Sequence, residues 1–458
     1  LFELVQPATV LKDKALTLAL APTLGETLAR QPGVSSTSFA PGASRPIIRG
    51  LGEDRLRVLQ NGTSVLDVSN VSPDHAVAAD PLAIRSVEVV RGPATLLYGP
   101  NTVGGVVNII DDRIPQERIT GADGSFDTRY GSADNLRSLS GAVNFGAGPL
   151  VFHLDAFTRE TDDLEIPGYT RSKRLREIDP QPDEARDRVP NSFSESDGGA
   201  AGVSYIWDKG FIGLSYSGMD SFYGAVAEED VTIDLNQRRW DLRGAFREPA
   251  DWIKEVNFKL GHSDYEHTEF EGREVGTRFM IDGFNGRTEL LHEAVNGFQG
   301  AVGYEIQYSD FSALGDEAFL PPVENRVNSL FVFEEREFDK FTLQLGGRYD
   351  YQTNETTSSS GFGPGLERDF NAFSTSAGVV YNPSEDYAVA LNLGYSQRPP
   401  TYVELFANGP HVATGAIEIG DADLGTEDSL SLDFSLRKKT GRVTGSISGF
   451  YYRFNDFV

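Results

Sequence analysis

Histidine and carboxylate side chains are the groups in this chain best able to bind a ligand or do chemistry. The sequence has six histidines and no cysteine, so thiol catalysis, disulfides and cysteine-ligated metal sites are excluded. Without cysteine, Zn²⁺ and similar divalent ions are held by imidazole nitrogen and carboxylate oxygen. Asp74 and His75 place these two donor types side by side in a predicted loop. The pair is either part of a cation site or an ordinary hydrogen-bonded loop pair.

Four further residues are candidate metal ligands. His411 lies in a long predicted loop, and Glu317 lies in another loop at the same predicted end of the molecule. His262 and His267 lie on one predicted strand, where alternation of side chains sends them to opposite faces. Both could contact an ion at the rim only if a bulge or the end of the strand intervened. The alternative for each of the four is a solvated polar side chain.

The overall charge and the motif content exclude several classes of function. The chain has 41 Lys and Arg against 68 Asp and Glu, a formal charge of 41 − 68 = −27. A nucleic-acid partner is excluded because phosphate binding needs a basic face. The G-x-S-x-G, H-E-x-x-H and P-loop motifs are absent, so we predict that the protein is not an enzyme.

The elements that must position these residues change in character near residue 116. From about Ile119 onward, apolar and polar residues alternate with a period of two, as in Phe341–Tyr351. The predicted strands run to roughly 10–15 residues, against an average of about 5–6. Aromatic residues gather at strand ends, and tight turns alternate with long polar loops such as 162–195. This pattern predicts an antiparallel transmembrane β-barrel over 116–458, with a soluble β-rich fold as the alternative.

The first part of the chain, residues 1–115, has short mixed elements instead. Thr23 and Glu26 have the spacing of a capping box at the start of a helix. Asn61 and Gly62 form a typical hairpin turn after a short apolar run. A small α+β unit ahead of a large barrel is expected to fill the lumen as a plug. No run of about 18 apolar residues is present, which excludes a transmembrane helix.

Many arginines in the predicted plug need partners if the plug is enclosed, because buried charges must be paired. Lumen-facing carboxylates of the barrel, such as Glu305 and Asp350, are the expected partners. Such polar contacts would hold the plug and could still be rearranged.

The predicted strand count indicates a longer barrel. About 15 strands are expected after residue 118, whereas single-chain bacterial barrels normally have an even number. Open sheet edges are costly in lipid. We therefore expect a barrel of the 22-strand type, truncated here at the C-terminus, with about seven strands beyond Val458.

Several motifs resemble those of TonB-dependent outer-membrane receptors. They are Pro46–Gly50, Val58–Gly62, Ser86–Val90, Arg91–Asn101 and Gly104–Ile110, in the order that the family has them. The resemblance implies energy-coupled uptake across the bacterial outer membrane, with the TonB complex and outer-membrane lipid as partners and a monomeric state. The family's TonB box would lie upstream of Leu1.

Within that family, the sequence most resembles the zinc-uptake, ZnuD-like branch. The residues that carry this resemblance are Gly42–Gly50, Ser72–Val77 and Glu404–Thr414. It implies Zn²⁺ or a similar divalent metal ion as the transported substrate, no cofactor, and ligand roles for Asp74, His75 and His411. A ferric-siderophore or haem receptor is the alternative in the same class, and a passive porin or an outer-membrane barrel enzyme is the alternative from another class.

Overall fold

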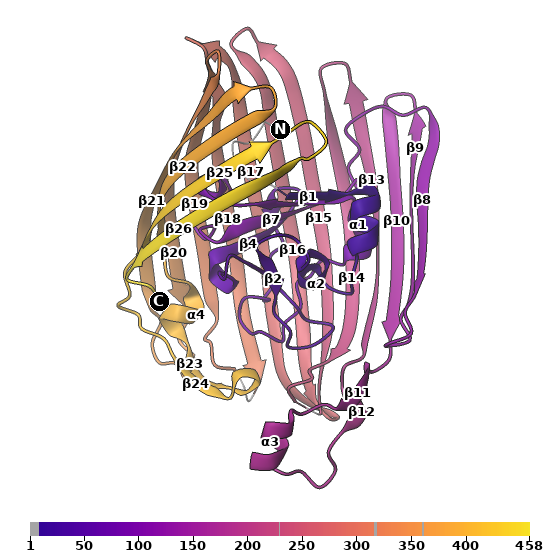
Figure 1. Cartoon of the computed structure of the whole chain (residues 1–458). Helices are drawn as coiled ribbons and strands as arrows, with labels where there is room; N and C mark the ends of the chain where they lie inside the picture. Colours follow the sequence, from indigo (N-terminus) through magenta and orange to yellow (C-terminus); the bar gives the residue numbers. More distant parts are fainter. Residues whose placement is uncertain (1–8, 229, 316–317, 360) are drawn as a thin grey trace.

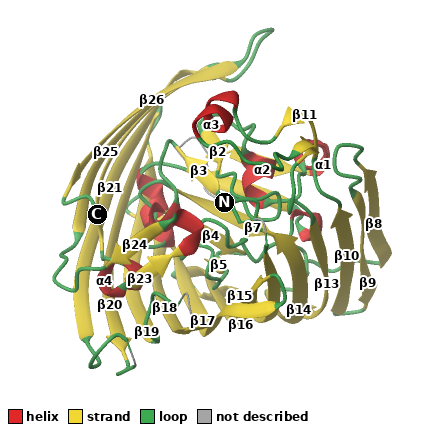
Figure 2. Cartoon of the chain, turned by 90° about the horizontal axis from the view of Figure 1, so that it is seen from below, coloured by secondary structure: helices red, strands yellow, loops and turns green. Residues whose placement is uncertain are grey.

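The computed structural model describes residues 9–228, 230–315, 318–359 and 361–458. A long, strongly curved sheet forms a wall around a smaller unit of mixed structure (Figures 1 and 2). This unit, formed by the N-terminal part of the chain, lies inside the curve of the wall, so it occupies the position expected of a plug.

The plug is built on a sheet of five short strands. Asn61 and Gly62 both have positive φ and make the predicted hairpin turn, which joins the strand Leu56–Gln60 to the strand Thr63–Ser64. Thr23 caps a helix by accepting a hydrogen bond from the backbone N–H of Glu26, as its spacing predicts. The sheet elements are β1 (Thr9–Lys12), β4 (Leu56–Gln60), β5 (Thr63–Ser64), β6 (Ser86–Val90) and β7 (Gly105–Ile110), in the order β1-β6-β7-β4-β5, accompanied by α1 (Asp13–Ala19), α2 (Leu24–Leu28), β2 (Val34–Ser36), β3 (Pro46–Ile48), η1 (Glu53–Arg55), η2 (Pro81–Ala83) and η3 (Pro93–Tyr98).

Within the described ranges, the wall is a 15-stranded antiparallel sheet in which each strand pairs with the next wall strand along the chain. This confirms the predicted fold class and the predicted number of strands. The strands are β8 (Gly121–Tyr130), β9 (Arg137–Ala147), β10 (Leu150–Thr161), β13 (Ser194–Trp207), β14 (Gly210–Gly224), β15 (Val231–Ala250), β16 (Ile253–Glu271), β17 (Glu274–Val295), β18 (Phe298–Gly315), β19 (Val323–Glu337), β20 (Phe341–Thr356), β21 (Glu367–Ser384), β22 (Tyr387–Arg398), β25 (Glu427–Lys438) and β26 (Gly445–Asn455).

The two rims of the wall differ as predicted. At one rim the connections are tight, for example Asp208 and Lys209 between β13 and β14. At the other rim, at the bottom of Figure 1, longer loops carry elements of their own. These are β11 (Glu165–Tyr169), α3 (Lys173–Ile178), β12 (Arg186–Arg188), α4 (Tyr402–Phe406), β23 (Asn408–His411), η4 (Val412–Thr414) and β24 (Ala416–Ile419).

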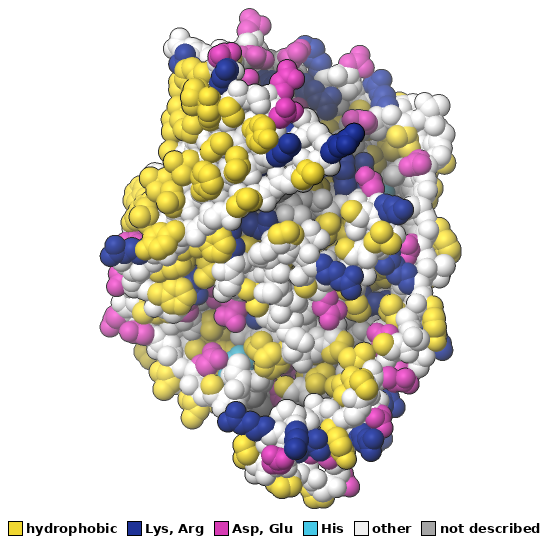
Figure 3. Space-filling view, viewed as in Figure 1, with side chains coloured by type: hydrophobic (Ala, Val, Ile, Leu, Met, Phe, Trp, Pro, Cys, Tyr) yellow, Lys and Arg dark blue, Asp and Glu magenta, His cyan; other side chains and the backbone are white. Residues whose placement is uncertain are grey.

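The faces of the wall also differ. Residues that face outward include many exposed apolar side chains, such as Leu214, Leu260 and Leu432, while the residues between them face the plug and are largely polar. Figure 3 shows hydrophobic side chains gathered over the outward face of the C-terminal strands, on the left. An apolar exterior around a polar interior is the arrangement of a transmembrane barrel.

None of the helices in the described ranges is both long enough and apolar enough to cross a bilayer.

Two neighbouring rows of outward-facing residues mark the edge of the apolar band near the long loops. The first row is mostly aromatic and consists of Tyr216, Trp240, His262, Phe284 and Tyr308, each directly opposite the next. Such a girdle lies at the membrane–water interface. The next row toward the long loops is acidic and consists of Asp264, Asp282, Asp310, Glu324, Glu355 and Glu367, again in direct register.

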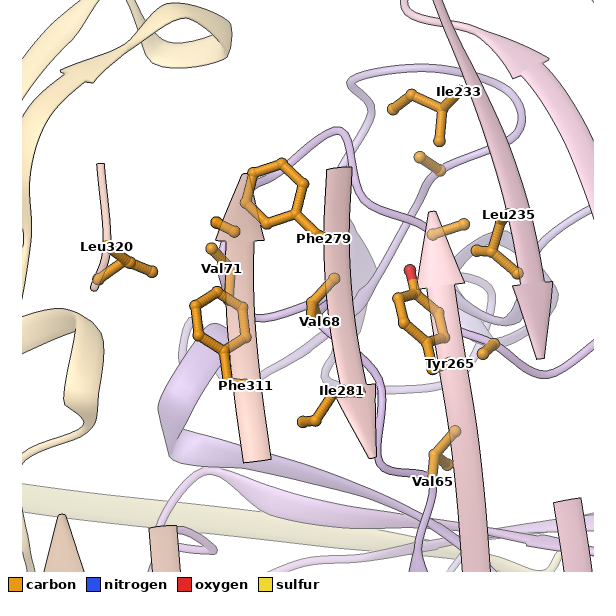
Figure 4. Close-up of a cluster of buried hydrophobic side chains, with 14 of the residues drawn as sticks. Val65, Val68, Val71, Ile233, Leu235, Tyr265, Phe279, Ile281, Phe311 and Leu320 are labelled. Carbon is orange, nitrogen blue, oxygen red and sulfur yellow. The ribbon is translucent and has the colours of Figure 1, made fainter. Parts of the chain in front are cut away.

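An apolar cluster fixes the plug against the wall near the long-loop rim. Val65, Val68 and Val71 of the plug pack against a wall surface that includes Ile281 and Phe311 (Figure 4). Burying such side chains stabilises a contact by about 1.5–3 kcal/mol each. The plug segment after β5 is therefore held firmly where it meets β16, β17 and β18.

Buried ion pairs also join plug and wall. Glu305, one of the predicted partners, pairs with Arg57 of the plug at 3.0 Å. Asp350 instead pairs with Arg348 of the wall itself, at 2.7 Å. Further pairs between plug and wall are Arg49–Asp433, Arg55–Glu427 and Asp80–Arg159.

Candidate metal site between the plug and the wall

The plug segment that carries Asp74 and His75 is ordered by its own polar groups. Both carboxylate oxygens of Asp67 accept backbone N–H groups, one from Ser69 and one from Ala78. The hydroxyl of Tyr223, on the wall, donates to the carbonyl of Asp74 at 3.0 Å and accepts from the N–H of Ala76. The segment therefore holds His75 against the long-loop half of the wall.

His75 is fully buried, and both of its ring nitrogens have defined partners. Nδ1 lies 3.0 Å from the carbonyl oxygen of Val68, which can only accept, so Nδ1 carries a proton. Nε2 lies 3.0 Å from a carboxylate oxygen of Glu269. Two acceptors would face each other here unless a cation or a second proton stood between them.

The pKa of His75 reflects this arrangement. Burial alone would lower the pKa of the imidazole, but the hydrogen bond to Glu269 and the charge of Asp74 outweigh it and raise the pKa. Without a metal ion, His75 therefore holds the extra proton more tightly than an ordinary histidine does.

His267 completes a group of three donors. It is fully buried on the lumen face of β16, two residues from Glu269, and its Nδ1 lies 2.9 Å from the hydroxyl of Tyr265. Its Nε2 lies 3.7 Å from a carboxylate oxygen of Glu269, beyond hydrogen-bond distance, and has no hydrogen-bond partner among the residues that the structure describes. One donor atom from each of His75, His267 and Glu269 lies within 4.8 Å of the others. The centroids of the two imidazole rings are 4.3 Å apart, and the ring of Phe279 packs against both.

A small cavity adjoins these donors. Its volume is about 20 Å³, enough for roughly one water molecule. Asp74, His75 and Glu269 line it from the plug and the wall, and Glu228 and His411 line it from the outer loops. A space of this size fits an ion and excludes an organic chelate.

His411 reaches the cavity but is already engaged. The hairpin of β23 and β24 pairs its Nδ1 with Glu418 at 2.6 Å, and its Nε2 lies 2.7 Å from the hydroxyl of Ser72. Ser72 also contacts a carboxylate oxygen of Asp74. This chain of polar contacts ties the outer hairpin to the plug, and His411 would have to leave Ser72 in order to bind an ion.

Glu228 lies in the turn between β14 and β15. Burial raises the pKa of Glu228 to about 7, and the charges of Asp74, Glu269 and Glu271 add to the shift. A carboxylate surrounded by other carboxylates favours either a proton or a metal cation.

The predicted ligands thus divide into two groups. Asp74, His75 and His411 line one cavity, and His267 lies with His75 in the group of donors beside it. His262 does not join them. It lies in the outward-facing aromatic row, with Nδ1 2.9 Å from the carbonyl of Gly283, because β16 runs without a bulge between the two histidines. The expected role of His262 beside His267 at the rim is not supported by this placement. Glu317 lies outside the described residues, so its role stays a prediction.

Glu269 and Glu228 were not among the predicted ligands. Glu269 had one available signal, since it shares a strand face with His267 at a spacing of two. Glu228 lies in a turn whose approach to the plug depends on the curvature of the wall, and no local pattern indicates it.

Comparison with known proteins identifies the family. Residues 178–458 match the family described as TonB dependent receptor-like, beta-barrel, and residues 1–106 match the TonB-dependent Receptor Plug Domain. The chain belongs to the TonB-dependent receptor family. It is therefore an outer-membrane receptor for energy-coupled uptake, and the enzyme and passive-pore alternatives are set aside. Where the receptor contacts TonB, and whether it is a monomer, remain predictions.

The relatives have various names. The vitamin B12 transporter BtuB of Photobacterium profundum is 22% identical over 462 residues, which cover 99% of this chain and 68% of that protein. The copper transporter OprC has a TM-score of 0.79 at 16% identity, with 94% of this chain and 68% of that chain covered. The Serratia marcescens hemophore receptor HasR, solved as a double mutant with its hemophore HasA and heme, has a TM-score of 0.80 at 16% identity, with 100% and 74% covered. The chain thus spans about two thirds to three quarters of these relatives. Their names do not favour the zinc branch.

Proposed function

We propose that this receptor takes up a divalent transition-metal ion, with Zn²⁺ the first choice, and that His75, His267 and Glu269 bind it. The observation that carries the proposal is the Nε2 atom of His267. It is buried, has no hydrogen-bond partner among the described residues, and shares a donor group with His75 and Glu269. Leaving such a nitrogen unsatisfied costs about 1–3 kcal/mol, which a bound ion would offset.

The donor set favours zinc over a softer ion. Two imidazole nitrogens and one carboxylate oxygen, with a fourth position open, suit Zn²⁺. A cuprous ion prefers sulfur ligands. The chain has no cysteine and only two methionines, and neither Met219 nor Met280 is among the described residues that line the cavity.

The surroundings of both histidines suit ligation. Metal-binding histidines usually donate their other ring N–H to a carbonyl or a similar acceptor, which orients the ring. His75 does this through the Val68 carbonyl, and Tyr265 contacts the corresponding nitrogen of His267. A bound ion would also replace the extra proton between His75 and Glu269.

A ferric siderophore or haem is less well supported. The donor cavity has room for roughly one water molecule. A larger cavity between plug and wall, about 180 Å³, is lined by Arg57, Glu305 and Arg348 and is smaller than the roughly 300 Å³ at which pockets for organic ligands begin.

The proposed site also suggests how the ion would be released. His75 belongs to the plug, whereas His267 and Glu269 belong to the wall. A shift of the plug would separate one ligand from the other two and lower the affinity for the ion. Energy delivered to the plug through TonB would then release the ion on the inner side.

The test is zinc titration calorimetry on the purified receptor and on two histidine variants. We expect one Zn²⁺ per chain in the wild type and an affinity at least about 100-fold lower in His267→Ala. His262→Ala is the matched control, because it removes a histidine from the same strand but from the outward face, and it should bind zinc as the wild type does. Equal zinc affinity in all three proteins would remove the proposed site.

A further inference from the structure

The turn between β14 and β15 is held rigidly over the cavity. Ala225 N–H donates to the carbonyl of Val231, and Val231 N–H donates to the carbonyl of Glu228. The side-chain amide of Asn191, from a neighbouring loop, points at the carbonyls of Ala225, Glu228 and Val231 at 2.6–3.1 Å. Asn191 approaches so closely that a Cβ on Gly224 would lie 2.2 Å from its Oδ1. The turn therefore presents Glu228 in a fixed position.

The cavity beneath this turn is strongly acidic. Asp74, Glu228 and Glu269 line it, and none of the described lining residues is a lysine or an arginine. Asp74 is satisfied by Ser72, and Glu269 is satisfied by His75. For the Glu228 carboxylate, by contrast, the described part of the chain offers no hydrogen bond or ion pair. Like charges held together at low dielectric are unfavourable unless a cation accompanies them.

We infer that Glu228 is the mouth ligand of the metal site: it receives the incoming divalent ion from the outer side and, through one retained water, completes the coordination that His75, His267 and Glu269 leave open. The inference rests on the proposed function and extends it to a residue on the outer loops. Glu228 does not belong to the group whose donors lie within 4.8 Å of one another. It therefore contacts the ion at the edge of the site through that water.

This role gives the turn a function in selecting the ion. With Glu228 the donors are two nitrogens, one carboxylate and a water held by a second carboxylate, a set that suits Zn²⁺ and other borderline divalent ions and offers nothing to a soft monovalent one. Asn191 acts as a positioning residue, since it contacts the backbone of the turn and not the cavity.

The experiment compares Glu228→Gln with Glu271→Gln by zinc calorimetry on the full chain. Glu271 contributes to the same negative field but is exposed and does not line the cavity, so it controls for the loss of one charge. We expect Glu228→Gln to weaken zinc binding about 10- to 100-fold and Glu271→Gln to change it less than about threefold. Glu228→Asp, which keeps the charge but shortens the side chain, should fall between the two.

The possible outcomes separate the two proposals. If the wild type binds zinc, His267→Ala abolishes binding and Glu228→Gln binds like Glu271→Gln, the inference about Glu228 is overturned and the proposed function stands. If the wild type binds no zinc, the proposed function is refuted, and the inference about Glu228 is refuted with it. A folding defect in Glu228→Gln would appear as a lower melting temperature. In that case Asn191→Ala provides the test, because a displaced turn should weaken zinc binding and leave the His75, His267 and Glu269 donors in place; unchanged binding in that variant would overturn the inference.

Discussion

Glu305 stands at the centre of the charge network between plug and wall, and its replacement by glutamine should loosen the plug. Its carboxylate lies 3.0 Å from Arg57 of the plug and 3.3 Å from Arg287 and from Arg348 of the wall. The two wall arginines have second partners, Glu289 and Asp350. The network contains three guanidinium groups and three carboxylates, so it is neutral as it stands.

The magnitude follows from this balance. Glu305→Gln leaves one uncompensated positive charge in a buried network, and removing one partner of a buried ion pair costs about 3–5 kcal/mol. Undocking the plug would return Arg57 to water and relieve much of that cost. We therefore expect the free energy of plug undocking to fall by about 3 kcal/mol, which corresponds to roughly 100-fold more frequent opening.

Hydrogen exchange of the β4 amides, Leu56–Gln60, is the assay. These amides should exchange about 100-fold faster in Glu305→Gln. Adding Arg57→Gln restores neutrality and should recover most of the protection. Glu324→Gln is the control, since Glu324 pairs with Arg326 at the surface, where such pairs contribute about 0–1 kcal/mol. Unchanged exchange in Glu305→Gln, or no recovery in the double variant, would refute the electrostatic account of plug docking.

Three other changes test separate parts of the structure. Burial raises the pKa of Asp54 in the plug to about 6, and the charge of Glu404 adds to the shift. The protonated carboxyl is therefore favoured in the folded protein, and stability is lost as pH rises from the unfolded pKa through about 6. Asp54→Asn should stabilise the protein by about 1–2 kcal/mol at pH 7 and by nothing near pH 3, as measured by urea unfolding. Asp282 lies directly between Asp264 and Asp310, so Asp282→Asn should raise the melting temperature at low salt, and the gain should shrink in high salt. Zinc at 100 times its Kd should stabilise plug docking by about 2.7 kcal/mol in protease-resistance assays, and a chelator should reverse the effect; identical digestion with and without zinc would contradict a site shared by plug and wall.

The sequence predicts the architecture well because the barrel wall is periodic. Alternation with a period of two depends only on which face of a strand meets lipid, so strands such as Phe341–Thr356 are visible without tertiary information. The same rule separates His262 from His267. The order of the plug motifs likewise indicates the family from short segments.

The proposed metal site is harder to predict because its residues come together only in the folded chain. His75 lies in the plug, whereas Glu269 is far along the chain on β16, and their contact depends on how the plug sits in the wall. Asp74 and His411 are close to the site, yet Ser72 and Glu418 already occupy their polar atoms. The position of Glu228 depends on Asn191, a contact between two loops that no sequence period describes.

Anomalous X-ray diffraction at the zinc absorption edge, on crystals of the receptor grown with zinc, tests the central claim most directly. We predict a single strong peak about 2.0–2.2 Å from Nε2 of His75, Nε2 of His267 and a carboxylate oxygen of Glu269. A zinc-loaded crystal with no peak among these three side chains, or with peaks only on surface carboxylates, would contradict the account.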